Sequence, residues 1–186
     1  MIPGYSAVSP SSSSILKSRL YFAVLSVLDG AHDVYLLCHG VDSGYTSAYF
    51  SGDCTVTMVD SQLVNLYQNN SGADLHYLET AEDFTGRLTM IQSAYWGSTK
   101  GAFILRGEGD VVMYGVQMHS AGVPLCRLDG GSLSLYGMLE TSRTEDFHIG
   151  EGALSLDISG NVFPGGLQIK KDDNATADIT GSDVEE

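Results

Sequence analysis

The side chains of this chain that could carry out chemistry are mainly carboxylates near predicted turns. Glu108 lies one sequence repeat from Gly130 and two from Glu151, and Asp129 directly precedes Gly130. Two carboxyl groups about 5–9 Å apart can hydrolyse a glycosidic bond, one as the acid and the other as a base or nucleophile. Acidic residues are also common in turns because they bond nearby backbone groups. Turn formation accounts for Glu108, Asp129 and Glu151, so we assign no catalytic residue.

The other polar side chains show no pattern typical of a metal or nucleophile site. The five histidines form no H-x-H or H-x-x-x-H motif, so metal binding has no support. No Ser-His-Asp or Cys-His arrangement follows from the spacing. Gly107-Glu108-Gly109 lacks the rest of a phosphate-binding loop and the helix that should follow it. We expect neither a metal nor a cofactor.

The three cysteines, Cys38, Cys54 and Cys126, are widely separated and include no C-x-x-C motif. Their odd number excludes a complete internal disulfide framework. Cys38 and Cys126 fall at inward positions of the repeat described below, which predicts buried free thiols. This is typical of a chain that matures in a reducing compartment.

Aromatic side chains suggest a second chemistry, because a ring offers apolar area together with a polar tip that suits a sugar. The candidates for glycan binding are Trp96, Tyr95 and Tyr77, joined by Tyr114 and Tyr136. Packing within the protein is the alternative role for each of them.

A hydrophobic unit that recurs about every 22 residues must position these side chains. Its copies are separated by 22, 32, 23, 22, 21 and 21 residues, and begin at Val34, Val56, Leu88, Val111, Leu133, Leu154 and Ala175. The first and third residues of each copy are small or apolar, as one inward side of a β-strand requires. A repeat of this length is typical of a solenoid whose coils stack on one another.

The sequence therefore predicts an all-β fold, a single-stranded parallel β-helix of about seven coils with an N-terminal arm or cap. We expect a flexible arm at 1–18, the β-helix at 19–181 and an acidic tail at 182–186, with an enlarged turn at Thr80–Gly86. Antiparallel strands of a sandwich would alternate in the same way, but equal spacing with like-on-like stacking favours the solenoid.

The outward positions of the predicted strands also form columns along the rod. One column is apolar or aromatic over five coils and then acidic: Leu37, Val59, Ile91, Tyr114, Tyr136, Asp157 and Asp178. An outward apolar stripe usually marks an interface, so we predict one at its first five members. Cover by the N-terminal arm or by loops is the alternative. Two further contacts are expected, Arg106 with Asp129 and Arg127 with His148.

The net charge of −14 limits the partners of the chain. It disfavours nucleic acid and anionic membrane surfaces, since there is no Lys/Arg cluster to offset it. The apolar segment Leu20–Leu28 is too short to span a bilayer as a helix. No recognisable signal peptide begins the sequence, which has no basic region before a continuous apolar run.

The patterns at Gly131–Gly137, Gly152–Gly160 and Asn174–Gly181 resemble those of right-handed β-helix proteins of the pectin-lyase-like superfamily. The resemblance covers roughly residues 30–181. It implies a family that contains polysaccharide lyases, glycosidases, adhesins and trimeric phage tailspikes. None of its catalytic motifs can be matched here residue by residue.

These observations predict a structural or adhesive subunit of a larger surface assembly, and specifically a bacteriophage virion protein of the tailspike or capsid-decorating kind. We expect a homotrimer, because that symmetry buries the same face of every subunit, with other virion proteins or cell-surface glycans as further partners. Its place would be the virion or an extracellular surface. The alternatives are a fragment of a polysaccharide lyase or glycoside hydrolase, and a non-catalytic glycan-binding module.

Overall fold

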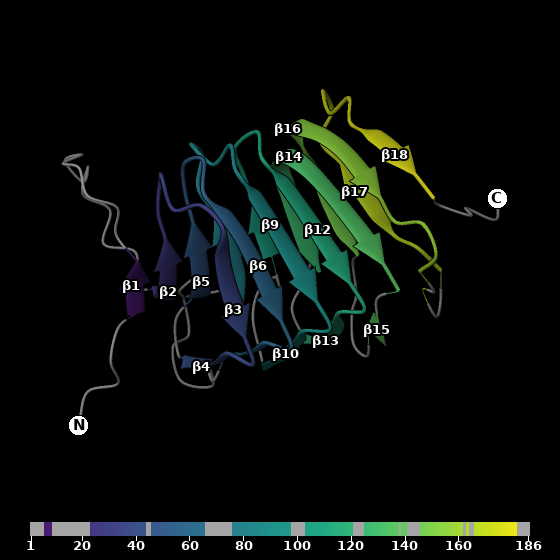
Figure 1. Ribbon diagram of the computed structural model, residues 1–186. Coiled ribbons are helices and arrows are strands. Elements are labelled where there is room, and N and C mark those ends of the chain that lie inside the picture. The colour runs from purple at the N-terminus through teal and green to yellow at the C-terminus, as the bar shows by residue number, and fades with distance from the viewer. Residues whose placement is uncertain are drawn as a thin grey trace.

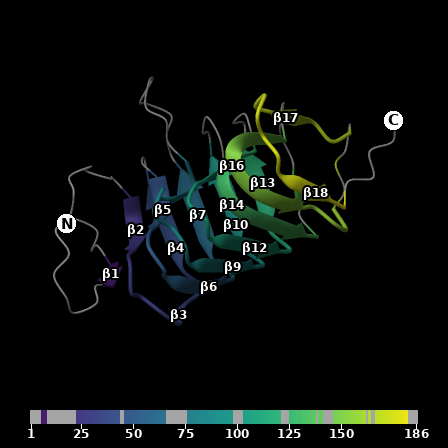
Figure 2. The ribbon, with the colours of Figure 1, turned by 90° about the horizontal axis from the view of Figure 1, so that it is seen from above.

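The structure is a computed structural model, and it describes residues 6–8, 23–43, 46–65, 76–97, 103–120, 125–137, 139–140, 146–161, 163 and 166–181. These residues form a β-solenoid in which short strands wind around a common apolar core (Figures 1 and 2). Every strand pairing among them is parallel. The predicted all-β parallel fold is confirmed.

The strands form three faces, which we call A, B and C. Face A consists of β3 (Val34–Leu37), β6 (Thr55–Val59), β9 (Arg87–Ile91), β12 (Asp110–Tyr114), the ends of β14 (Cys126–Tyr136) and β16 (Phe147–Asp157), and β18 (Asp178–Thr180). Face B consists of β1 (Ser6–Val8), β2 (Ala23–Val27), β5 (Thr46–Phe50), β8 (Leu78–Thr80), β11 (Phe103–Leu105), the starts of β14 and β16, and β17 (Ile169–Lys171). Face C consists of β4 (Gly40–Ser43), β7 (Gln62–Asn65), β10 (Ala94–Gly97), β13 (Gln117–Ser120) and β15 (Leu139–Glu140).

The solenoid has about five complete turns rather than the predicted seven. Face C is a 5-stranded sheet that ends at β15, so the turns that follow contribute strands to faces A and B only, within the described residues. The predicted division into arm, β-helix and tail is not tested by the described residues. Ser6–Val8, inside the predicted arm, forms β1 and pairs with β2. The rest of 1–18 and the acidic tail at 182–186 lie outside the described residues.

The inward columns of the first five coils are confirmed. Val34 pairs with Val56 and then Leu88, and Val111 pairs with Leu133. The neighbouring column passes from Leu36 to Met58, Met90, Met113 and Leu135. Among these side chains Met58, Leu88 and Met90 have no exposed surface at all. Full burial of such a side chain contributes roughly 1.5–3 kcal/mol, so each turn is stabilised mainly by the column that it continues.

The predicted columns are wrong in the last two coils. Leu133 pairs with Leu156 rather than Leu154, and Leu156 pairs with Ile179 rather than Ala177. Two register shifts between β14 and β16 explain the error, since each β-bulge adds one residue to β16. Leu154 consequently points outward and is 56% exposed.

The step of 32 residues between Val56 and Leu88 is about ten residues longer than the others. The enlarged turn predicted at Thr80–Gly86 accounts for only part of this difference. Residues 81–86 connect β8 to β9, whereas 51–54 make the equivalent connection from β5 to β6. Most of the extra length lies between the end of β7 at Asn65 and the start of β8 at Leu78. Residues 66–75 of that connection are outside the described part of the chain.

The corner between faces B and A holds glycines because successive turns approach each other there without room for a side chain. A Cβ atom on Gly130 would lie 2.4 Å from the carbonyl oxygen of Gly107, and one on Gly86 would lie 1.9 Å from that of Cys54. By contrast, a Cβ atom on Gly40 would meet nothing within 4 Å. The corner glycines therefore set how closely the turns stack.

This close approach predicts a difference between two glycine substitutions. Gly130→Ala should lower the free energy of unfolding by about 2 kcal/mol, because the added methyl forces the stacked backbones apart. Gly40→Ala, the matched control, should stay within about 0.5 kcal/mol of the unchanged protein. Urea unfolding followed by circular dichroism measures both. Equal stability of the two variants would contradict the packing described for this corner.

Candidate interaction face

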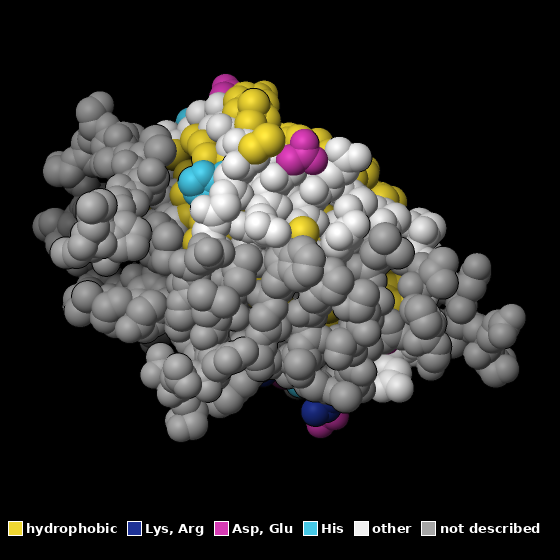
Figure 3. All heavy atoms as spheres, turned by 90° about the horizontal axis from the view of Figure 1, so that it is seen from below, with side chains coloured by type: hydrophobic (Ala, Val, Ile, Leu, Met, Phe, Trp, Pro, Cys, Tyr) yellow, Lys and Arg dark blue, Asp and Glu magenta, His cyan; other side chains and the backbone are white. Residues whose placement is uncertain are grey.

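Face A carries an outward stripe of apolar side chains, which we call the apolar stripe: Leu37, Val59, Ile91, Tyr114 and Tyr136. The strand register aligns these five residues one turn after another, as the sequence predicted. Leu37 is 66% exposed and Tyr114 is 42% exposed, while the other three are partly buried. In the view from below, hydrophobic side chains gather along the upper edge of the molecule (Figure 3).

The outward column beside the apolar stripe is also uncharged over the same five turns. It runs through Tyr35, Thr57, Thr89, Val112 and Ser134. Tyr35 is the most exposed large hydrophobic residue of the described part, at 67%. Ten adjoining outward positions without charge are notable on a chain whose net charge is −14. These two columns are thus suited to contact another surface without desolvating charges, whereas Arg87 and Asp110 are exposed at the start of β9 and β12 on the same face.

The apolar stripe ends at a polar contact. The rings of Tyr114 and Tyr136 are stacked, with centroids 5.2 Å apart and planes inclined by 19°. The Tyr136 hydroxyl donates a hydrogen bond of 2.7 Å to Oδ2 of Asp157. Asp157 is aligned with Ser134 by the strand register and not with Tyr136, which corrects its predicted column.

The hydrogen bonds at Asp157 alter two pKa values in opposite directions. Bonds from the Ser159 side chain, at 2.6 Å, and then from Tyr136 lower the pKa of the Asp157 carboxyl, because they stabilise its charged form. The same Asp157 carboxylate raises the pKa of Tyr136 above 10.0, because the phenolate would lose this bond and face a like charge. Asp157 therefore favours the protonated hydroxyl of Tyr136, one of the two stacked rings.

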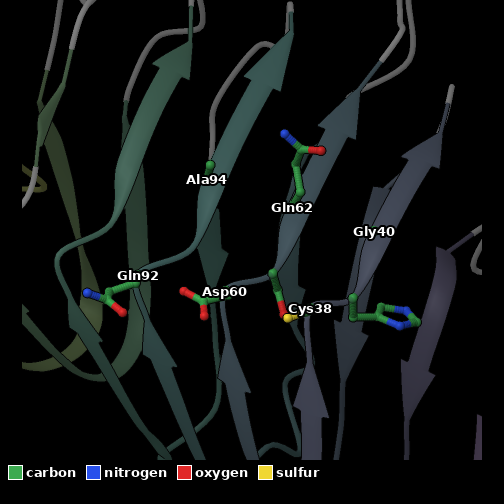
Figure 4. A pocket seen from close by; sticks show the side chains of 8 residues that line it. Cys38, Gly40, Asp60, Gln62, Gln92 and Ala94 are labelled. Atoms are coloured by element: carbon green, nitrogen blue, oxygen red, sulfur yellow. The ribbon is translucent and has the colours of Figure 1, made fainter.

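A groove of about 340 Å³ follows the corner between faces A and C, beside the apolar stripe. Cys38, Asp60 and Gln92 lie in a row along it, each directly after a residue of the apolar stripe (Figure 4). All three adopt left-handed backbone conformations, with φ of 51°, 49° and 48°. Gly115 and Gly137 hold this conformation in the next two turns, where it costs a glycine no strain.

Sequence reasoning missed this corner row and misplaced one of its members. Cys38 was expected to be buried, but it is exposed, since β3 ends at Leu37 and the left-handed corner turns the next side chain outward. Cys54 and Cys126 are buried free cysteines. Burial raises the pKa of the Cys54 thiol to about 11 and raises that of Cys126 as well. The sequence signal that could have located this corner is a residue of the apolar stripe followed by a polar residue or cysteine, once in each turn: Leu37-Cys38, Val59-Asp60 and Ile91-Gln92.

The acids considered for catalysis bond to separate partners. The single Nε–H of Arg127 donates a bifurcated hydrogen bond to the two carboxylate oxygens of Asp129, at 2.8 and 2.9 Å. Glu151 accepts one of 2.9 Å from Asn174, and Glu108 is an exposed turn residue. The described contacts thus do not join any two of these acids.

Of the two side-chain contacts expected on face B, one is wrong, and the other is present only as a neighbouring pair of strand positions. Arg106 forms its ion pair with Glu79, one turn earlier, and not with Asp129. Arg127 and His148 are neighbours in the strand register, as predicted. His148 nevertheless bonds to Asp172 in the following turn, at 2.9 Å.

The aromatic residues considered for glycan binding lie in different environments. Tyr77 has no exposed surface, so its ring belongs to the core and offers no face to a ligand. Tyr95 and Trp96 lie in β10, where they pair with Leu63 and Val64 of β7. Their side chains are outside the described part of the structure.

Comparisons of the chain with protein-family models, with curated proteins and with solved structures find no match. Among the described residues, no three His, Cys, Asp or Glu side chains are grouped so that they could hold a metal ion. The same residues include no helix long and apolar enough to cross a membrane.

The contact between Tyr136 and Asp157 predicts an alkaline titration. Tyr136 should titrate above its ordinary value, and Asp157→Asn should return its pKa toward 10.0, since the carboxylate is the main cause of the shift. NMR of ¹³C-labelled tyrosine rings, with Tyr136 assigned from Tyr136→Phe, follows each hydroxyl separately. Asp178→Asn, which changes an exposed acid one turn later, is the control. Identical titration of Tyr136 with and without Asp157 would contradict the contact.

Proposed function

We propose that this chain is a structural or adhesive β-solenoid subunit of a larger surface assembly and that face A joins it to its neighbours. The observation that carries this proposal is the apolar stripe, in which Leu37 and Tyr114 are exposed, beside an uncharged column on a strongly acidic chain. Large contiguous apolar patches on a protein surface usually mark protein–protein contacts. Parallel packing of the strands also makes the face regular, so that a long contact can form along the rod.

A homotrimer is the assembly that suits this face. Three parallel rods around a threefold axis would each bury the same side, and a closed ring leaves no apolar surface for further growth. The acidic charge supports contact at face A in particular, because two chains of net charge −14 repel each other wherever acids meet. The resemblance of the glycine-flanked repeats to those of β-helix proteins supports a phage virion as the setting.

A non-catalytic glycan-binding module is the second candidate. The stacked rings of Tyr114 and Tyr136, next to the groove that contains Asp60 and Gln92, favour it. An aromatic surface flanked by polar groups is the combination that sugars use. Loss of glycan binding by Tyr114→Ala, with oligomeric state unchanged, would favour this candidate over the assembly subunit.

Charged substitutions on the apolar stripe test the proposal. Leu37→Lys with Tyr114→Lys should weaken self-association at least tenfold, since the interface would have to desolvate two like charges on every subunit. Size-exclusion chromatography with light scattering over a range of concentrations gives the mass. Leu154→Lys, at a 56% exposed leucine outside the apolar stripe, is the matched control and should associate normally. A monomer at every concentration of the unchanged protein would overturn the homotrimer.

A further inference from the structure

The last turn of the solenoid, residues 166–181, which we call the terminal rung, contributes little to the core. Ala177 is its one buried residue. Its larger apolar side chains, Leu167, Ile169 and Ile179, pack on the core but stay partly exposed. The preceding turn is quite different, with buried side chains at Phe147, Ile149, Ala153, Leu156 and Ile158. Hydrophobic burial therefore holds the terminal rung much less firmly than the turn beneath it.

Polar contacts of carboxylates join the terminal rung to the turn before it, where little apolar surface is buried. Oδ2 of Asp146 accepts a hydrogen bond of 2.5 Å from the backbone N–H of Gln168. His148 Nε2 lies 2.9 Å from Oδ1 of Asp172, and the pair Glu151–Asn174 adds the third contact, at 2.9 Å. The three contacts join residues 22, 24 and 23 positions apart. We call these three contacts the carboxylate latch.

The charges around Asp172 favour its ionised form. His148 on β16 lowers the pKa of Asp172 most, and Arg127 on β14 and Lys170 on β17 act in the same direction. Arg127 is itself bound to Asp129. A carboxyl whose pKa is lower when folded adds stability at pH values above its unfolded pKa, and this stability is lost as pH falls through the folded pKa. Acid is therefore expected to weaken this contact.

Asp157 on face A also has a lowered pKa. The bonds from Ser159 in its own turn and from Tyr136 in the turn before lower it most, and the bond from Thr180 of the terminal rung contributes least. Its contribution to stability is also lost in acid. Thr180 lies in β18, which pairs with β16 from Ser155 to Asp157. The contact of Asp172 with His148 and, to a smaller degree, that of Asp157 with Thr180 thus depend on ionised carboxylates.

We propose that residues 166–181 form a cap that acid releases as one unit, while the turns before it remain folded. The cap covers the open edge of β16 at 147–149 and 155–157, where β17 and β18 pair. Its release leaves these backbone groups unpaired and exposes the apolar end of the core. An open strand edge of this kind readily accepts a further β-strand. The cap is thus a switch between a closed and an open end of the solenoid; it includes β18 at the end of face A but no residue of the apolar stripe.

Hydrogen exchange of the full chain, measured by mass spectrometry at several pH values, tests the cap. After correction for intrinsic exchange rates, residues 166–181 should lose protection as pH falls below about 4. The central turns, at 103–120 and 125–137, should keep their protection at the pH where the cap has lost it. Loss of protection by all turns at one pH would overturn the proposal.

A latch variant tests the same proposal at neutral pH. Glu151→Gln with Asp172→Asn should raise exchange in residues 166–181 at least tenfold at pH 7, without changing exchange in the central turns. Asp60→Asn, which changes an exposed acid at the groove, is the control and should alter neither region. Circular dichroism establishes that each variant is folded. Unchanged exchange in the folded latch variant would contradict the role of the carboxylates, whatever the oligomeric state.

Discussion

In-register stacking of successive turns is the constraint on which the rest of this structure depends. Each strand pairs in parallel with its equivalent one turn later, so a residue meets a residue of the same orientation above and below it. Inward positions then form continuous apolar columns, of which Met58, Met90 and Met113 are the clearest example. Corners must stack as well, and glycines such as Gly130 allow the backbones to approach. A side chain that does not suit its column affects two neighbouring turns at once.

Stacking also organises the surface, because outward positions become columns in the same way. The apolar stripe and the uncharged column beside it are consequences of this arrangement, and no loop has to build them. Towards the C-terminal end, Asp129, Asp157 and Asp172 each bond to a definite partner. The first proposal rests on the two uncharged columns of face A, and the second on the carboxylates that close the end of the rod.

Much of this arrangement could be predicted from the sequence because periodic burial is a strong signal. The repeat located the inward columns of five coils and the whole apolar stripe. It failed at Leu154, since β-bulges in β16 shift the register without any change in composition. It failed at Cys38, where strand β3 ends one residue earlier and the corner turns the side chain outward. The burial of Tyr77 and the choice of Glu79 as the partner of Arg106 depend on which side chains meet between neighbouring turns. The spacing of residues in the sequence does not specify those contacts.

Stacking can be tested most directly with the methionine column. In protein labelled at the methionine methyl groups, nuclear Overhauser effects should connect Met58 with Met90 and Met90 with Met113. Met58 and Met113, which are two turns apart, should show none. The two contacts and the one absence establish that these strands are neighbours in this order; methyl labels at Val56 and Leu88 then distinguish the direction, because only parallel strands join Val56 with Leu88 and Met58 with Met90 together. Absence of both the Met58–Met90 and the Met90–Met113 effects in the folded protein would contradict the solenoid, and the continuity of face A with it.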